Sequence, residues 1–268
     1  MNSENQAKDH TFRPPFSGRR INRYQNRLML VFTCLLCLSC AGCSSVSSSG
    51  TINKDNLPAI TLHLAGDSTV MNYAATTTQE GWGQQLGQFF IDKVTINNQA
   101  VGGANVRSFR NSRWSNILSV LKPGDYVMIQ FGANDSGTAH GPVTPSDFES
   151  TLGQMADEIK AGQATPVFVT PSAFYQWKDG KQDNTRLSPY AAAMVTAGAA
   201  KNVQVVDLNA RGVEFLNSIG QTAAMTLYMP SRGTVDKAHF VKAGSTKMAQ
   251  FVADELQRIR SPLAAYLK

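Results

Sequence analysis

Five apolar, β-rich runs recur along the chain, and helical patterns separate them. The runs cover residues 59–66, 94–101, 126–132, 165–171 and 203–208. Helical patterns are expected near residues 80–91, 112–121, 145–162, 188–201 and 243–259. Strands that alternate with helices in this way are typical of a parallel sheet covered on both faces. The sequence therefore predicts an α/β fold, a three-layer α/β/α sandwich with a central parallel sheet.

The domain that carries this pattern is expected to span residues 57–268. No internal repeat and no second boundary interrupts it, and its length suits one ordinary α/β domain. Residues 44–56, SSVSSSGTINKDN, form a Ser-rich polar stretch before it. Such a stretch buries too little apolar surface to fold, so it is interpreted as a tether.

Residues 1–43 have the composition of an export leader. They hold six basic residues against two acidic ones, and the uncharged run Leu28–Leu38 follows the basic stretch. Its 11 residues suit the apolar core of a signal peptide and are too few to span a bilayer. All four cysteines lie in this leader, so no disulfide is expected within the mature domain. They are Cys34, Cys37, Cys40 and Cys43.

The end of the leader, Cys40-Ala41-Gly42-Cys43, resembles a bacterial lipobox. The resemblance implies that Cys43 receives a diacylglycerol and anchors the protein to a membrane outside the cytoplasm. Ser44 after it implies the outer membrane, with a periplasmic location as the other possibility. Leucine is more usual where Cys40 stands, so ordinary secretion after nearby cleavage is the alternative. An iron–sulfur cluster is disfavoured, because these cysteines alternate with leucine in an apolar stretch.

The charge of the remaining chain argues against nucleic acid as a partner. Of the formal net charge of +6, the leader accounts for +4, and the rest holds 19 basic and 17 acidic residues. A surface this balanced does not favour a polyanion.

Polar residues follow the first three runs of the predicted sheet. Gly66-Asp67-Ser68-Thr69 ends the first, Gly102-Gly103-Ala104-Asn105 follows the second, and Gly132-Ala133-Asn134-Asp135 ends the third. The carboxyl ends of parallel strands converge on the ligand crevice, so these groups are expected at one edge. A fourth polar segment, Asp236 to His239, comes shortly before the last helix.

These residue types suit nucleophilic acyl transfer. A serine hydroxyl needs a base to accept its proton, and the base needs a third group to orient it. Ser68, His239 and Asp236 are candidates for these roles, with Asp236 and His239 expected to share one loop. The backbone N–H groups of Ser68 and Gly103, with the side-chain amide of Asn134, are candidate donors to an oxyanion.

The other histidines of the mature chain have simpler interpretations. His63 alternates with leucines inside a predicted strand and is interpreted as structural, whereas His140 lies in a predicted loop and is interpreted as solvated. His239 is therefore the favoured base.

In their order and spacing, these four segments resemble the blocks of the SGNH (GDSL-type) hydrolases. The sequence that connects these segments, including Gly81-Trp82-Gly83, is most similar to rhamnogalacturonan acetylesterases and related polysaccharide deacetylases. The resemblance implies that Ser68 is the nucleophile, His239 the base and Asp236 its partner, with Ser68, Gly103 and Asn134 forming the oxyanion hole. It also implies a serine esterase that removes acetyl groups from a carbohydrate, with no metal or cofactor.

Differences from the family pattern concern the substrate more than the reaction. Ala133 stands where histidine is common, Ala104 stands where arginine is common, and Ser172-Ala173 follows Thr170-Pro171 where arginines are usual. Basic side chains that would meet a uronic acid backbone are therefore missing at these positions. Two alternatives stay open: a lipase or thioesterase acting on longer acyl chains, and a catalytically silent lipoprotein that binds glycans.

Overall fold

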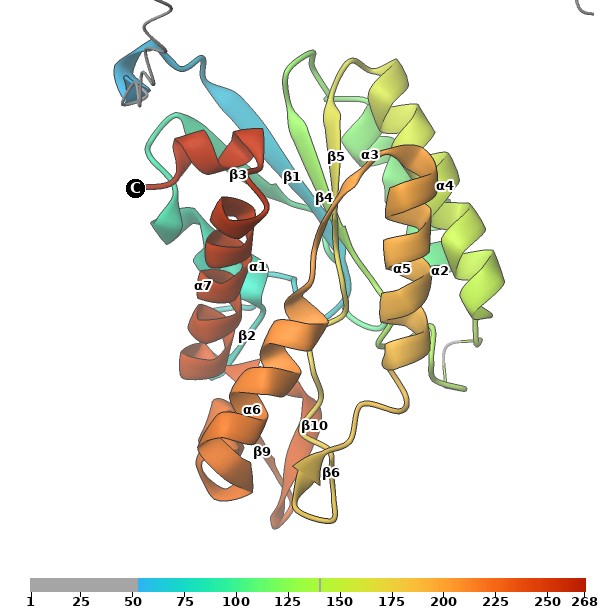
Figure 1. Cartoon of the computed structure of the whole chain (residues 1–268), viewed down its shortest axis with the longest axis vertical. Coiled ribbons are helices and arrows are strands. Elements are labelled where there is room, and N and C mark those ends of the chain that lie inside the picture. The colour runs from blue at the N-terminus through green and yellow to red at the C-terminus, as the bar shows by residue number, and fades with distance from the viewer. Residues whose placement is uncertain (1–52, 140) are drawn as a thin grey trace, which may run out of the picture. The chain divides into compact units, whose positions relative to one another are not determined.

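A parallel sheet of five strands forms the centre of the computed structural model, which describes residues 53–139 and 141–268 (Figure 1). The strands are β1 (Ile60–Gly66), β3 (Val94–Asn98), β4 (Tyr126–Gln130), β5 (Thr165–Val169) and β8 (Gln204–Val206). Their order in the sheet is β3-β1-β4-β5-β8, and every neighbouring pair is parallel. Each strand lies within one of the five apolar runs, so the predicted α/β fold is confirmed.

Helices cover both faces of this sheet (Figure 1). On one face lie α2 (Val106–Ser112), α3 (Trp114–Leu118), α4 (Pro145–Ala161) and α5 (Ser188–Lys201). On the other lie α1 (Trp82–Leu86), α6 (Leu208–Ala224) and α7 (Lys242–Arg258).

Neighbouring residues of one strand contribute to different cores. Met128 packs in the core under α1, α6 and α7, whereas Val127 and Ile129 pack in the core under α2 to α5. A strand buried on both faces has no polar face, which explains why each run is continuously apolar.

Proline marks the first turn of two predicted helices. Pro145 occupies the start of α4, and the Thr144 side chain before it accepts a hydrogen bond from the backbone N–H of Asp147. Pro189 lies in the first turn of α5. Both positions tolerate proline because the first N–H groups of a helix have no partner within it. The predicted helices 145–162 and 188–201 are confirmed.

Three helical expectations need correction. The helix predicted over 112–121 is shorter in the structure, where α3 covers only Trp114–Leu118. Helix α2 was not predicted: it begins at a capping box formed by Asn105 and Ser108, and non-helical Arg113 separates it from α3. The helix predicted over 80–91 is shorter, because α1 gives way to the 3₁₀ helix η2 (Gly87–Phe89). Helix α6 was not predicted, and Asp207 caps its start.

Short antiparallel strands were also not predicted. One small sheet pairs β10 (Thr234–Val241) with β2 (Gln79–Glu80) and with β9 (Tyr228–Ser231). A second joins β6 (Trp177–Lys178) to β7 (Lys181–Gln182). The 3₁₀ helix η3 (Met225–Leu227) precedes β9, and η4 (Pro262–Tyr266) follows α7. The segment expected to be the loop of Asp236 and His239 is part of β10.

The leader and Cys43 lie outside the described residues, as does most of the expected tether. Its last part, Lys54–Asn56, forms the 3₁₀ helix η1, and Lys54 Nζ donates a hydrogen bond to the carbonyl of Leu267. Within residues 53–139 and 141–268, no helix is long and apolar enough to cross a membrane.

A close backbone approach joins α1 to the turn after β1. A Cβ at Gly83 would lie 2.5 Å from the carbonyl oxygen of Val70 and 2.8 Å from Leu64 Cδ1. At Gly87, which has helical backbone angles and is exposed, a Cβ would meet only Ile96, at 3.4 Å. The Gly81-Trp82-Gly83 segment is therefore a packing feature of α1.

This contrast predicts opposite effects of the same substitution. Gly83→Ala is expected to lower the free energy of unfolding by about 2–3 kcal/mol, because the backbone of Val70 has to move. Gly87→Ala is expected to raise it by up to about 1 kcal/mol, because alanine favours the helical conformation. Urea denaturation of both variants measures the difference. Equal effects of the two substitutions would contradict the packing argument.

Candidate active site

The turn after β1 presents Ser68 at the carboxyl edge of the sheet. Asp67, the residue before it, is fully buried, and its Oδ1 accepts hydrogen bonds from the backbone N–H of Thr69 (2.9 Å) and from Thr69 Oγ1 (2.8 Å). The backbone N–H groups of Val70 and Met71 both donate to the Asp67 carbonyl. These bonds fix the turn, and they leave the half-buried Ser68 side chain accessible.

A chain of buried side chains supports this turn from below. Trp82 Nε1 donates to Gln130 Oε1 (2.7 Å), and Gln130 Nε2 donates to Thr69 Oγ1 (2.6 Å). Thr69 Oγ1 in turn donates to Asp67 Oδ1. Because each donor has one acceptor, the chain has a single direction and ties the turn to α1 and β4.

One oxygen of Asp67 is left out of this chain. Oδ2 is buried and has no hydrogen-bond partner among the described residues. Burial raises the pKa of Asp67 from its ordinary value of 3.8 to about 6, and the hydrogen bonds from Thr69 oppose only part of this rise. The carboxyl group next to Ser68 is thus unusually easy to protonate.

A break in the pairing of β10 places Asp236 and His239. The register of β10 against β9 shifts between Val235 and Phe240. Within this irregularity, Asp236 Oδ1 accepts hydrogen bonds from the backbone N–H groups of Ala238 (2.8 Å) and His239 (2.9 Å). The Asp236 side chain therefore replaces the strand partner that the bulge has lost.

The second oxygen of Asp236 holds the imidazole. Oδ2 lies 3.0 Å from His239 Nδ1. Burial raises the pKa of Asp236, but the hydrogen bonds from the His239 side chain and from the backbone outweigh it and leave the pKa below its ordinary value. A carboxylate in this position favours the imidazole tautomer that carries its proton on Nδ1.

The other ring nitrogen of His239 faces Ser68. His239 Nε2 lies 2.9 Å from Ser68 Oγ, although the two residues are 171 positions apart. With the proton on Nδ1, Nε2 accepts a hydrogen bond from the serine hydroxyl. The structure thus brings Ser68, His239 and Asp236 into one hydrogen-bonded series.

The three candidate oxyanion donors come from the ends of β1, β3 and β4. Gly103 has a φ of 75°, which favours glycine, and Asn134 Nδ2 donates to the Ala104 carbonyl (2.9 Å). This bond orients the Asn134 amide and leaves its second N–H for another acceptor. Among the described residues, the backbone N–H groups of Ser68 and Gly103 have no acceptor.

Asp135 joins the second and third of these loops. Its carboxylate accepts hydrogen bonds from the backbone N–H groups of Val106 (2.9 Å) and Gly132 (2.8 Å). Gly132 has a φ of 123°, and a Cβ there would lie 2.9 Å from Pro171 Cγ. Asp135 is fully buried and therefore holds the loops of Gly103 and Asn134 together rather than facing a substrate.

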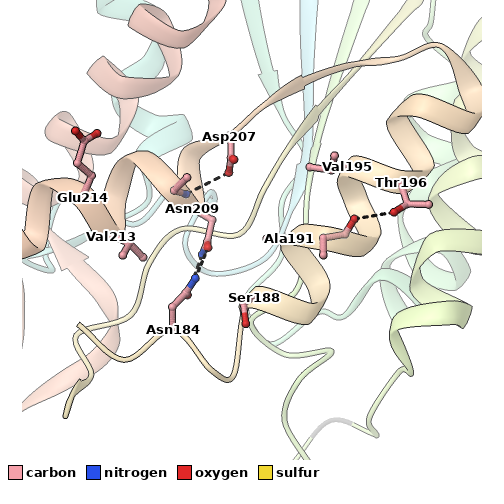
Figure 2. A pocket seen from close by; sticks show the side chains of 11 residues that line it. Asn184, Ser188, Ala191, Val195, Thr196, Asp207, Asn209, Val213 and Glu214 are labelled. Carbon is pink, nitrogen blue, oxygen red and sulfur yellow. Dashed lines mark hydrogen bonds between the residues drawn. The ribbon is translucent and has the colours of Figure 1, made fainter. Parts of the chain in front are cut away.

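Within the part of the chain that the structure describes, two cavities lie near the carboxyl edge of the sheet. The larger, about 690 Å³, lies between α5 and α6, where Asn184 and Asn209 pair across it (Figure 2). None of the predicted site residues lines this cavity. The smaller, about 480 Å³, is lined by Asn134 and by Arg186 from the segment before α5.

Sequence reasoning missed two residues near the candidate site. Tyr73 Oη donates to the Ser68 carbonyl (2.9 Å), and burial raises the pKa of Tyr73 to about 12. Arg186 lies beside the loop of Asn134. Neither belongs to a motif. Tyr73 lies only five positions after Ser68, whereas Arg186 reaches the site through the fold. The structure also places His63 in the core, beside Asp125, as its strand position suggested.

The described residues do not suggest a metal site. Within residues 53–139 and 141–268, no three histidine, cysteine, aspartate or glutamate side chains are grouped so that they could hold an ion.

A Ser–His–Asp series at the carboxyl edge of a parallel sheet is an arrangement that suits ester hydrolysis. The family model of the GDSL-like lipase/acylhydrolase family matches residues 64–244. The chain belongs to this family and is a carboxylic ester hydrolase.

Two relatives from Bacillus subtilis (strain 168) cover most of the domain. The chain is 33% identical over 207 residues to the probable rhamnogalacturonan acetylesterase YesY, covering 75% of this chain and 94% of the relative. It is 32% identical over 219 residues to the rhamnogalacturonan acetylesterase RhgT, covering 78% of this chain and 94% of the relative.

Solved structures agree with the fold. The Bacillus subtilis protein YxiM superposes with a TM-score of 0.69 at 30% identity, covering 76% of this chain and 57% of that protein. An acetylxylan esterase from Geobacillus stearothermophilus superposes with a TM-score of 0.57 at 18% identity, covering 74% of this chain and 94% of the esterase.

The buried carboxyl of Asp67 predicts a pH dependence of stability. Its pKa is higher in the folded state than in the unfolded state, so the folded protein holds this proton more tightly. The protonated carboxyl therefore contributes up to about 3 kcal/mol to the free energy of unfolding. This contribution is complete below about pH 4 and is lost as the pH rises through 6. Asp67→Asn removes it. Urea denaturation between pH 4 and 7 is expected to show that wild type loses stability relative to the variant.

Asp254→Asn, on the exposed side of α7, serves as the control for the loss of one surface charge. A stability difference between wild type and Asp67→Asn that stays constant with pH would contradict the prediction.

Proposed function

We propose that this chain is a serine esterase that removes O-acetyl groups from a polysaccharide or oligosaccharide. The observation that carries the proposal is the 2.9 Å contact between Ser68 Oγ and His239 Nε2, with Asp236 on the other ring nitrogen. The acetyl group and the carbohydrate are supported by the relatives, which are named as rhamnogalacturonan acetylesterases.

In the first half of the proposed reaction, Ser68 Oγ attacks the acetyl carbonyl and His239 Nε2 accepts its proton. Asp236 stabilises the imidazolium that forms. The negative charge on the carbonyl oxygen is met by the N–H groups of Ser68, Gly103 and Asn134. When the tetrahedral intermediate collapses, His239 returns the proton to the sugar oxygen. The sugar leaves with a free hydroxyl group, and the acetyl group stays on Ser68.

In the second half, a water molecule replaces the sugar. His239 removes a proton from the water, whose oxygen attacks the acetyl carbon, and the same donors stabilise the second intermediate. The proton then returns to Ser68 Oγ, and acetic acid leaves and ionises to acetate in solution. His239 gives back each proton that it accepts, and Ser68 gives up the acetyl group that it receives, so the proposed reaction needs no metal or cofactor.

The proposal predicts that Ser68→Ala lowers kcat/KM for 4-nitrophenyl acetate by at least about 10³-fold, because the nucleophile is lost. Release of 4-nitrophenolate by the purified domain measures this. Ser218→Ala, which removes an exposed hydroxyl from α6, is the matched control. Equal turnover by wild type and Ser68→Ala would remove Ser68 from the mechanism.

A series of ester chain lengths and a glycan-binding measurement separate the rival functions. A preference for octanoate over acetate esters would favour a lipase or thioesterase. Glycan binding without ester cleavage, unchanged by His239→Ala, would favour a silent binding protein.

We also propose that the protein is exported and anchored through lipid on Cys43, on the strength of the leader composition alone. In a Gram-negative host, wild type is expected to incorporate radiolabelled palmitate and to fractionate with membranes, and Cys43→Ser is expected to do neither. Cys40→Ser keeps the anchor residue and is the control. Export of unlabelled wild-type protein would instead support ordinary secretion.

A further inference from the structure

The smaller cavity adjoins the proposed oxyanion hole and has one charged wall. Its lining residues are Asn134, Ser136, Gly137, Thr138, Ala139 and Arg186. Asn134 is shared with the proposed oxyanion hole, so a substrate whose acetyl group reaches Ser68 has this cavity beside it. Apart from Arg186, the lining offers an amide, two hydroxyls and small side chains.

The Arg186 guanidinium is held in place by the loop that carries Asn134. Nε donates to Ser136 Oγ (2.9 Å), and Nη2 donates to the carbonyl of Ala133 (3.0 Å). Its planar group also lies over the Phe174 ring, 5.1 Å from the ring centroid. Gly137 makes room for it, because a Cβ there would lie 2.8 Å from Nη2.

This cation has no acidic partner. Within the part of the chain that the structure describes, no carboxylate lies within ion-pair distance of Arg186. Two of the five guanidinium N–H groups are used by Ser136 and Ala133, so three remain. The planar arrangement of these donors matches a carboxylate, and the side chain is exposed to solvent.

We propose that Arg186 forms a subsite for the carboxylate of a uronic acid residue in the substrate. The proposal rests on the proposed deacetylase function and narrows its substrate to acetylated glycans that carry uronic acids. The cation comes from the segment before α5 rather than from the positions near Ala104, Ala133 and Ser172 where the family places basic side chains. Arg186 is thus a specificity-determining residue, and its guanidinium, fixed in advance, loses little freedom on binding.

Matched substrates test this subsite. Acetylated oligogalacturonate and the same material with its carboxyls converted to methyl esters differ in charge, and acetate release gives kcat and KM for each. Wild type is expected to prefer the free acid. Arg186→Gln is expected to raise KM for the free acid about 10- to 100-fold, which removes most of the preference, and Arg186→Lys is expected to restore part of it.

Two variants control for charge and for position. Arg260→Gln removes an exposed arginine that follows α7, and it is expected to keep the preference of wild type. Gly137→Ala keeps the charge but displaces the guanidinium, so it is expected to reduce the preference. Equal losses on both substrates in Arg186→Gln would mean that Arg186 only braces the loop, which would overturn the proposal.

Binding separates this proposal from the proposed function. Calorimetry on Ser68→Ala with oligogalacturonate that lacks acetyl groups requires no turnover. Tighter binding of the free acid than of its methyl ester, lost when Arg186→Gln is added, supports the subsite even if wild type releases no acetate. The same affinity for both ligands would overturn the subsite, even if acetate release establishes the deacetylase.

Discussion

A single carboxylate, that of Asp236, fixes both the backbone and the imidazole on which the site depends. One oxygen accepts two backbone N–H groups inside the bulge of β10, and the other lies 3.0 Å from His239 Nδ1. Without the backbone bonds, the bulge would leave two N–H groups without a partner, and the imidazole would lose its direction toward Ser68. The Asp236 carboxylate therefore serves both the structure and the proposed chemistry. The spacing of three positions between Asp236 and His239 is enough for one carboxylate to reach both the backbone and the imidazole.

The turn that carries Ser68 holds its carboxyl group in the opposite kind of surroundings. Asp236 is half-buried and well supplied with donors, so its pKa is lowered, whereas Asp67 is fully buried with an oxygen that lacks a partner, so its pKa is raised to about 6. The pKa values of these two aspartates are therefore shifted in opposite directions, because their surroundings differ. The directed chain from Trp82 through Gln130 and Thr69 holds Asp67 in this costly position.

The strands of the central sheet could be predicted from the sequence because helices bury them on both faces. Strands covered on both faces must be apolar throughout, so the five runs identify the sheet, and Pro145 and Pro189 mark helix starts. Helix α6 was missed because glycines interrupt its pattern and Gly220 adopts a φ of 77°. The pairing of β2 with β10 was missed because it joins residues about 160 positions apart, and a local sequence pattern carries no information about such pairing. The candidate triad was found through its motif, although the prediction of a loop around Asp236 was not correct.

Arg186 shows where motif reasoning stops. The positions near Ala104, Ala133 and Ser172 lack basic residues, and from sequence this reads as a loss of affinity for acidic sugars. In the folded chain, Arg186 reaches the loop of Asn134 from 52 positions away, and Gly137 leaves the space for its guanidinium. A charge recognised by a substrate has to lie at the right place in space, but the segment that supplies it is free to vary. On the proposal made for Arg186, the segment before α5 supplies a charge that the positions near Ala104, Ala133 and Ser172 lack.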